Sequence, residues 1–324
     1  MFSNIKIKWL AIIFIVLLLL VLVVLPKKNN TTNRSFKSDL ADFETEDVTA
    51  IYIYPKSSGS LITLEKEGDN WKVVTPEGET YPADKNQAEN MLTTLNELTA
   101  KRLVSREKSA WEQYQVNDSL GTRVQVLTGK KVVADIYVGK FDYQQAQNPN
   151  PYSRQQGIMT SYVRLANDKD VYAVDGFLSM TFGRSAQDFR SRKMVQFDRD
   201  KATRFSFTTP EGNFNLTKQD SLWLVDGVTA DSATMADFLS NIHNVQTGAF
   251  VGKEAVLSQN PKYILTIEGT DMPQIKVEAF ASDTTNNYAL SSSLNQGSYF
   301  SGKGGLFDKF FKTKEAFIKG MTDD

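Results

Sequence analysis

A lysine that follows closely spaced glycines lies near the C-terminal end of the chain, in Gly297–Gly304 (GSYFSGKG). The segment nearly matches the phosphate loop G-x-x-x-x-G-K-[ST], in which glycines let backbone N–H groups approach an anion. Gly304 replaces the hydroxyl residue that would hold Mg²⁺, and Tyr299 and Phe300 are typical of a strand. We therefore interpret the segment as a turn between the last strand and the last helix.

The chain has few residues for a site built on histidine or cysteine, because it contains one histidine, His243, and no cysteine. These counts exclude disulfides, thiolate catalysis and zinc sites that need sulfur within this chain. A Ser-His-Asp arrangement is conceivable, but the chain has no G-x-S-x-G elbow. His243 ends an expected amphipathic helix, where a protonated imidazole is favoured, so a capping or surface role is the better interpretation.

Carboxylates can hydrolyse a glycoside without histidine if two of them face each other across the bond. Acidic residues gather before the first expected strand and at the middle of the chain: Glu44, Glu46 and Asp47, then Asp198 and Asp200. We interpret both groups as solvated boundary residues. Asp168-Lys169-Asp170 has too few oxygen ligands for a Ca²⁺ loop. The sequence therefore predicts no catalytic, cofactor-binding or metal-binding residue and no cofactor.

Two further segments could contact a partner. Arg184–Lys193 is basic and could bind an anionic lipid or polymer, although we interpret it as the charged face of a helix. The polar loop Tyr143–Gln156 contains two prolines and has no equivalent in the second half of the chain. It is either a plain variable loop or a partner-binding insertion.

The composition argues against two classes of protein, nucleic-acid binders and disordered chains. With Lys+Arg 37 against Asp+Glu 38, the formal net charge is -1, and nucleic-acid binders usually carry a basic excess. Hydrophobic residues make up 41% of the chain, which argues against wholesale disorder. We expect a folded protein without a nucleic-acid partner.

The most apolar segment is Trp9–Leu25, which has no charged side chain. As a helix it is about 26 Å long, at the short end of the membrane-spanning range. Lys6 and Lys8 also resemble the start of a signal peptide, but no small-residue cleavage site precedes Pro26. We therefore predict an uncleaved signal anchor that contacts the lipid bilayer. The expected location is the inner (cytoplasmic) membrane, single-pass, with the large domain periplasmic or otherwise extracytoplasmic.

The rest of the chain is an internal repeat. Short alternating strands open both copies, a third strand in each carries a tryptophan, Trp71 or Trp223, and an amphipathic helix follows. Asp84 and Asp231 are the expected N-caps of these helices. Both copies continue with further strands and end in a second helical segment, expected over 177–192 and 306–318.

This order of elements has mostly short connections, which favours antiparallel pairing. We predict an α+β fold class: an N-terminal transmembrane helix followed by two similar modules, each a mainly antiparallel sheet with a helix packed on one face. The expected boundaries are a membrane anchor over 1–28, a polar linker over 29–40, a first repeat over 41–196 and a second repeat over 197–324.

The sequence resembles the bacterial family called domain of unknown function 4340 over Ala41–Ile318. The resemblance rests on Trp71-Lys72-Val73 and on the mid-chain segment 188–197 (DFRSRKMVQF). No settled activity comes with this resemblance. It implies an association with ABC-type transport systems, including those of gliding motility, which is context and not mechanism.

Two functions are compatible with these observations, and a third interpretation, a purely structural spacer, is not distinguished from the first of them by the sequence. The first is a non-enzymatic, membrane-anchored envelope protein that acts as a binding or accessory component of a membrane complex such as an ABC-type transporter. The alternative is an envelope hydrolase that cleaves glycan or peptidoglycan with paired carboxylates.

Overall fold

The computed structural model describes residues 36–56, 60–144, 158–257, 260–282 and 287–318. The chain separates into two compact units, Met1–Ser38 and Asp39–Asp324. The second unit holds both sheets and all the helices given below.

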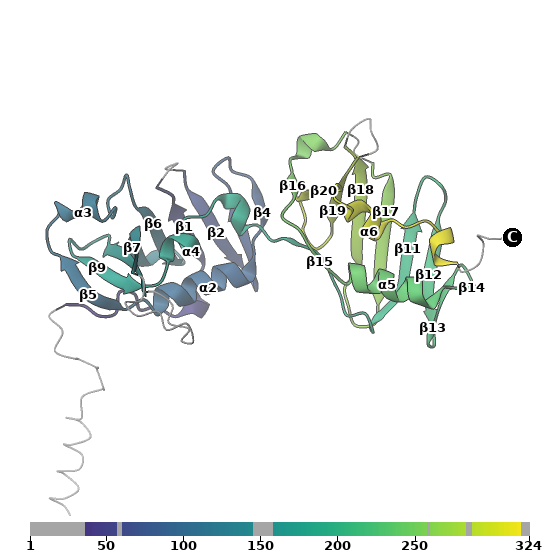
Figure 1. Ribbon diagram of the computed structural model, residues 1–324, viewed down its shortest axis with the longest axis horizontal. Coiled ribbons are helices and arrows are strands. Elements are labelled where there is room, and N and C mark those ends of the chain that lie inside the picture. The colour runs from purple at the N-terminus through teal and green to yellow at the C-terminus, as the bar shows by residue number, and fades with distance from the viewer. Residues whose placement is uncertain (1–35, 57–59, 145–157, 258–259, 283–286, 319–324) are drawn as a thin grey trace, which may run out of the picture. The chain divides into compact units, whose positions relative to one another are not determined.

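The first sheet has nine strands, all paired antiparallel (Figure 1). In sheet order they are β4 (Thr80–Pro82), β3 (Asn70–Val74), β2 (Ile62–Glu67), β1 (Ala50–Tyr54), β6 (Thr122–Thr128), β7 (Lys131–Gln144), β8 (Ile158–Leu165), β9 (Val171–Asp175) and β5 (Ala100–Ser105). On the central strand β1, Ile51 and Ile53 are buried whereas Tyr52 and Tyr54 are partly exposed. This alternation places the two isoleucines on the core face of the sheet.

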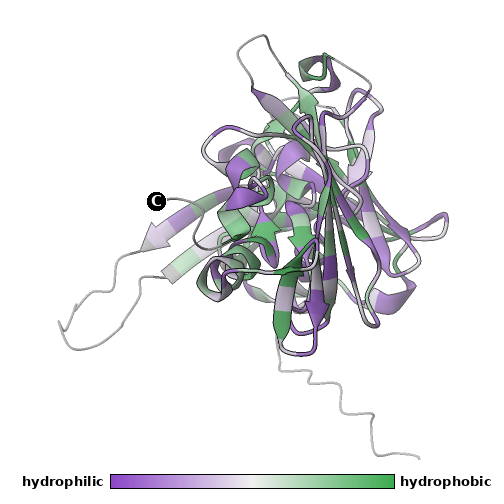
Figure 2. Ribbon diagram, turned by 90° about the vertical axis from the view of Figure 1, so that its right-hand side faces the viewer, coloured by the Kyte–Doolittle hydropathy of each residue, from purple (hydrophilic) through white to green (hydrophobic). Residues whose placement is uncertain are grey.

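The second sheet also has nine antiparallel strands. In sheet order they are β14 (Val228–Thr229), β13 (Leu222–Val225), β12 (Phe214–Gln219), β11 (Ala202–Thr208), β17 (Tyr263–Gly269), β18 (Ile275–Ala281), β19 (Tyr288–Ser292), β20 (Tyr299–Ser301) and β16 (Phe250–Val251). Figure 2 shows hydrophilic and hydrophobic bands alternating along the strands, as expected for sheets with one apolar face.

The two sheets have the same strand order, position by position. The register agrees as well, because Trp71 lies opposite Lys66 in the β2–β3 pair and Trp223 lies opposite Lys218 in the β12–β13 pair. The two tryptophans are therefore structural equivalents, as the sequence predicted.

Helices are short. The α-helices of the described residues are α2 (Lys85–Asn96), α3 (Ala110–Gln113), α4 (Leu178–Phe182), α5 (Ser232–Ile242) and α6 (Leu306–Phe310). The 3-10 turns are η1 (Thr45–Asp47), η2 (Ala186–Phe189), η3 (Lys253–Ala255) and η4 (Glu315–Phe317). As predicted, Asp84 and Asp231 cap α2 and α5, accepting hydrogen bonds from the backbone N–H groups of Gln87 (3.2 Å) and Thr234 (2.8 Å).

The predicted α+β fold class is wrong, because the described residues form a mainly antiparallel β fold in which helices are minor elements. The helices expected over 177–192 and 306–318 each break into one five-residue helix and one 3-10 turn. Gly183 is the C-cap of the first of these helices, and Phe311, whose backbone leaves the helical conformation (φ -111°, ψ 83°), is the C-cap of the other. Two edge strands in each half, β4 and β5 or β14 and β16, further raise the strand content.

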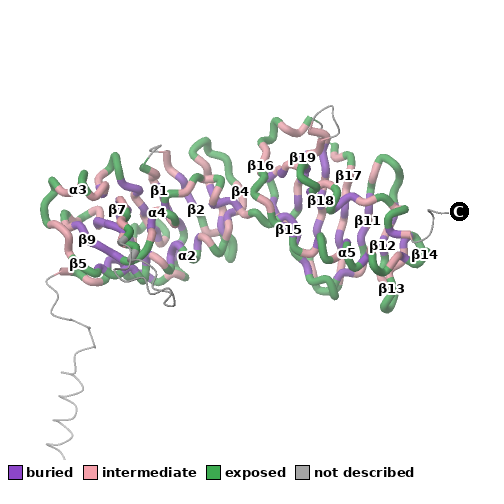
Figure 3. Tube along the Cα trace, in the orientation of Figure 1, coloured by how far each residue is buried: buried purple, intermediate pink, exposed green. Residues whose placement is uncertain are grey.

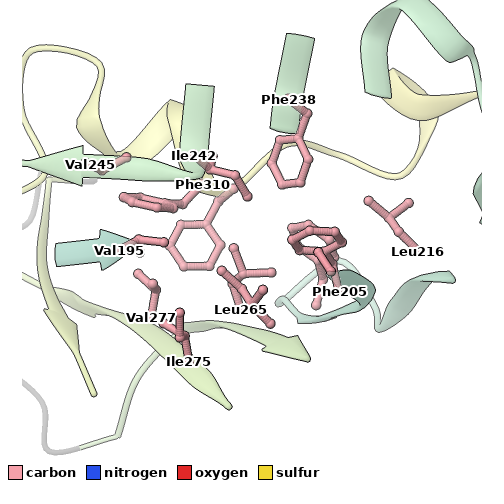
Figure 4. Packing of buried hydrophobic residues seen from close by; sticks show 14 of the residues in the cluster. Val195, Phe205, Leu216, Phe238, Ile242, Val245, Leu265, Ile275, Val277 and Phe310 are labelled. Carbon is pink, nitrogen blue, oxygen red and sulfur yellow. The ribbon is translucent and has the colours of Figure 1, made fainter. Parts of the chain in front are cut away.

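The core of the second half is rich in phenylalanine. Figure 4 shows Phe205 and Leu265 of the sheet, Phe238 and Ile242 of α5, and Phe310 of α6 directed into one cluster. Buried positions alternate with less buried ones along several strands, among them β3, β6 and β18 (Figure 3). In the first half the buried side chains of α2 are Ala88, Met91, Leu92 and Leu95, the helical face expected from the sequence.

The strand that precedes the second sheet belongs to the second half. β10 (Lys193–Gln196) pairs with β15 (Asn244–Gln246), and its Met194 and Val195 lie in the core of the second half. Residues 193–196 therefore pack with the second sheet. The expected boundaries of the anchor, the linker and the two repeats stay predictions.

Among the described residues, no helix is both long and apolar enough to cross a membrane. The longest, α2, has 12 residues and is about 18 Å long, whereas a bilayer core is about 30 Å thick. This finding corrects the predicted single-pass location in the inner membrane with a periplasmic domain. Trp9–Leu25, the predicted anchor, lies outside the described residues.

Candidate functional site at Arg190

The acidic residues considered for hydrolysis lie on the surface and in corresponding loops of the two halves. Glu44, Glu46 and Asp47 are exposed before β1, and Asp198 and Asp200 are exposed before β11. Of the five, Glu46 lines a cavity, together with Glu89, but its volume of about 220 Å³ is below the size of most ligand pockets. The structure therefore does not bring these carboxylates together in a ligand-sized cleft.

The other sequence candidates also have structural roles. His243 is the half-buried C-cap of α5, with Nδ1 2.9 Å from the carbonyl oxygen of Ser240. Gly297–Gly304 contains strand β20 and a turn, and the helix after it, α6, has only five residues. Asp168 accepts a hydrogen bond from the backbone N–H of Asp170 (3.1 Å) in the turn before β9. The described residues contain no group of three or more metal-ligating side chains. Most of Tyr143–Gln156 lies outside the described residues.

The basic segment Arg184–Lys193 is not the charged helix face that we predicted. It contains the 3-10 turn η2 and then runs in extended conformation beside β4, where the backbone N–H of Ser191 donates to the carbonyl of Pro82 (2.8 Å). This extended path turns Arg190 inward, and only 5% of its surface is exposed. The most informative residue of the segment is thus a buried arginine.

Two aromatic rings enclose the guanidinium of Arg190. Its central carbon lies 3.6 Å from the ring centroid of Tyr81 and 3.9 Å from that of Phe250. Nη2 donates to Oγ of Ser298 (2.9 Å). With both faces covered, the group can reach further partners only through the N–H groups at its edge, and cation–π contacts hold it in this plane.

Part of the hydrogen-bonding capacity of Arg190 is unused. Its buried Nε has no hydrogen-bond partner, and no carboxylate pairs with the side chain among the described residues. Arg164, the other buried arginine, is stacked between aromatic rings too, but its Nε donates to Val116 (2.9 Å) and its Nη1 lies near three more carbonyl oxygens. Since a buried charge normally has its full set of partners, Arg190 differs from a purely structural arginine.

Arg190 lines a cavity of about 540 Å³, within the range of small-molecule sites. We call this cavity the Arg190 pocket; its polar lining includes Thr75, Glu77, Glu79, Tyr81, Arg184 and Arg190. The hydroxyl of Thr75 is also buried and without a hydrogen-bond partner. Two of the four orphaned buried polar atoms in the described part of the chain therefore belong to residues of this one pocket.

Charges in the pocket are separated by depth. Glu77 and Glu79 are exposed on the turn between β3 and β4, whereas Arg190 is buried. Tyr81 donates its hydroxyl hydrogen bond to Glu79, which is the main reason why the pKa of Tyr81 is raised. Burial lowers the pKa of Arg190, and the negative charge of Glu79 opposes this shift. Arginine nevertheless stays charged at neutral pH.

The second half of the chain provides an internal comparison. Asp84 donates its backbone N–H to the carbonyl just before Arg190, and Asp231 donates to the carbonyl just before Ile318. Arg190 in the first half therefore corresponds to Ile318 in the second. The repeated fold does not require an arginine at this position.

The wall of the pocket has also diverged. Tyr81 lies opposite Val73 in the first sheet, and Val228 lies opposite Val225 in the second, so a valine replaces the stacking tyrosine. The turn before that strand runs over residues 75–79 in the first half but over Asp226-Gly227 alone in the second. The side chains that form the Arg190 pocket in the first half are therefore not repeated at the corresponding positions of the second half.

A second cavity, of about 630 Å³, is also lined by Tyr81, with Trp71, Lys72 and Lys193 among the other residues. Its cationic side chains are better paired, since Lys72 forms an ion pair with Glu67. Two further lining residues also have carboxylate partners, namely Lys85 with Glu89 and Arg192 with Asp188. We therefore regard the Arg190 pocket as the stronger candidate.

No sequence signal pointed to this site. Arg190 appeared only as one member of the basic segment 184–193 and of the family segment 188–197, and its partners Tyr81 and Phe250 are far away in sequence. Contacts of this kind follow from the fold and not from local spacing.

The comparisons with known proteins support the resemblance seen in the sequence. No curated protein and no solved structure matches the chain. One family does, described as "Domain of unknown function (DUF4340)", over residues 71–266. The match covers more than half of the chain and includes Trp71 and the segment 188–197. The chain therefore belongs to the DUF4340 family.

Proposed function

We propose that this protein is a non-enzymatic binding protein whose Arg190 pocket receives an anionic group of its ligand. The observation that carries the proposal is the buried Arg190, with an orphaned Nε and no carboxylate partner among the described residues. An arginine stays protonated at neutral pH, so it can bind and orient a group but is a poor general acid or base.

A carboxylate suits this guanidinium best. The rings of Tyr81 and Phe250 leave only the edge of the planar group available, and a carboxylate offers two acceptors in a matching plane. The hydroxyl of Thr75 lines the same pocket and could donate to such a group. Binding would supply both the missing acceptor and a countercharge.

The wider role that we propose is that of an accessory component of a protein complex such as an ABC-type transporter. This part rests on the family resemblance alone. Affinity purification of the intact protein, followed by mass spectrometry, tests it. Recovery of transporter subunits would support the role, and their absence under conditions that preserve such complexes would count against it.

Titration of the full-length protein with sodium acetate, followed by NMR, tests the pocket. We expect saturable shifts at millimolar acetate for residues of the Arg190 pocket. Arg190→Lys should weaken binding because it keeps the charge but loses the planar fork, and Thr75→Val should weaken it by removing a donor. The second substitution lies outside the aromatic stack, so a folded variant is expected even if the first destabilises the protein.

Arg199→Gln is the matched control, because it removes an exposed arginine outside the pocket and should leave acetate binding unchanged. Absence of saturable binding, or equal affinity in the Arg190→Lys, Thr75→Val and control variants, would overturn the proposal.

A further inference from the structure

The arrangement of charge in the Arg190 pocket specifies more than a simple anion. Its four charged lining residues are two glutamates, Glu77 and Glu79, and two arginines, Arg184 and Arg190. Arg184 is already committed, since its Nε donates to the carbonyl of Met180 (2.8 Å) and its Nη1 donates to the side chain of Gln87 (3.3 Å). Arg190 is the cation whose buried Nε has no acceptor and which has no carboxylate partner among the described residues.

The two glutamates carry negative charge at the exposed side of the same cavity. Glu79 accepts a hydrogen bond from Tyr81, and no ion pair holds Glu77 or Glu79 among the described residues. A multiply charged anion that enters to reach Arg190 would pass these carboxylates and be repelled by them. A ligand that carries its own ammonium group would instead be attracted at both ends.

We infer that the Arg190 pocket binds a zwitterion, with the carboxylate at Arg190 and the ammonium group at Glu77 and Glu79. The chemical class is an amino acid or a short peptide, and a cavity of about 540 Å³ has room for either. This inference rests on the proposed function and deepens it by naming the class of ligand.

Calorimetric or NMR titration of the full-length protein with four probes tests the inference: acetate, methylammonium, γ-aminobutyrate and inorganic phosphate. Gamma-aminobutyrate has the two opposite charges and a short spacer. We expect it to bind about twofold to fivefold more tightly than acetate, as a partly exposed charge pair would provide. Phosphate should bind more weakly than acetate.

The double substitution Glu77→Gln with Glu79→Gln then separates the two ends of the ligand. It should remove the advantage of γ-aminobutyrate over acetate while acetate affinity is kept or increased. Glu107→Gln with Glu112→Gln is the matched control, because it changes the net charge equally at exposed positions outside the pocket.

The outcomes distinguish a failure of the zwitterion inference from a failure of the proposed anion site. If acetate binds but γ-aminobutyrate binds no better, or if phosphate binds most tightly, the zwitterion inference fails and the proposed anion site stands. If the advantage of γ-aminobutyrate survives the double substitution, the glutamates are not its partners and the inference fails. If none of the probes binds, the proposed function fails as well.

Discussion

At the residue scale, the equivalent tryptophans of the two sheets differ in how far they are buried. Trp71 is 2% exposed, whereas Trp223 is only partly buried and lies 5.3 Å from the ring of Phe205. The indole Nε1 of Trp71 has no hydrogen-bond partner among the described residues. Hydrophobic packing, and not a polar contact, is therefore what Trp71 contributes.

We predict that Trp71→Ala lowers the free energy of unfolding by about 3–5 kcal/mol, because it removes a buried aromatic side chain and leaves a cavity. Trp223→Ala should cost less, since part of its surface is already exposed. Trp71→Phe should be mild because it also removes the unpaired N–H. Denaturant unfolding of the full-length variants measures all three, and equal losses for the two alanine variants would contradict the burial argument.

A second residue-scale prediction concerns Asp188, which caps the turn η2 just before Arg190. The hydroxyl (2.7 Å) and the backbone N–H (3.1 Å) of Ser185 both donate to Asp188, and the hydroxyl is the main cause that lowers the pKa of Asp188. A carboxyl with a lowered folded pKa adds stability above its unfolded pKa of about 3.9 and loses it as the pH falls through the folded pKa.

Asp188→Asn should therefore be less stable than the parent at neutral pH, by no more than about 1 kcal/mol for this half-exposed cap. The difference should shrink as the pH falls below 3.8, the ordinary pKa of the carboxyl. Urea unfolding at several pH values measures it. A difference that stays constant down to the lowest accessible pH would contradict this explanation.

At the element scale, the tight turn between β13 and β14 depends on backbone conformation. Asp226 and Gly227 have φ values of 46° and 92°, the positive pair required by a two-residue hairpin turn. Asp226 also accepts a hydrogen bond from Lys314 (2.7 Å). The turn thus fastens the edge strand of the second sheet.

Gly227→Val should cost about 1–2 kcal/mol, because a β-branched residue is strained at positive φ. Gly248→Ala is the control: its φ is not in that region, and the nearest atom to an added Cβ is a side-chain atom of Arg192 at 3.4 Å. Thermal unfolding compares the two. Equal stability of Gly227→Val and the parent would show that the turn relaxes without cost.

At the scale of the whole molecule, buried polar side chains hold the connector between the two sheets. The Nδ2 of Asn295, a fully buried residue, donates to the carbonyls of Ser191 (2.6 Å) and Lys193 (3.0 Å), and Ser298 accepts from Arg190. These contacts satisfy the backbone where the chain leaves the first sheet. The connector is therefore fastened by side chains of the second half.

Asn295→Ala should lower stability by about 1–3 kcal/mol, since it removes the donor of two partly buried hydrogen bonds to backbone carbonyls. It should also speed trypsin cleavage at Arg190, Arg192 or Lys193, which limited proteolysis with mass spectrometry detects. Asn90→Ala, at an exposed position of α2, is the control. Cleavage of Asn295→Ala at the rate of the control would mean that the asparagine does not protect the connector.

Apart from the edge strands β4, β5, β14 and β16, the amino-acid sequence by itself determined the strands of the two nine-stranded sheets, and it determined the duplication, the tryptophan equivalence and the caps at Asp84 and Asp231. These features depend on alternation and capping within a few residues, or on one segment repeating another. It also led to the family. It overestimated the helices, because the amphipathic pattern over 177–192 did not reveal the break at Gly183.

Only the tertiary structure decided what Arg190 does. Within its own segment it is one of several basic residues, and nothing nearby predicts its burial. Its surroundings come from separate parts of the chain, since Tyr81 of β4, Phe250 of β16 and Ser298, just before β20, meet it only after both nine-stranded sheets have formed. What a buried charge can bind depends on which hydrogen-bond partners it already has and which are missing. For Arg190, both depend on contacts between residues that are far apart in the sequence.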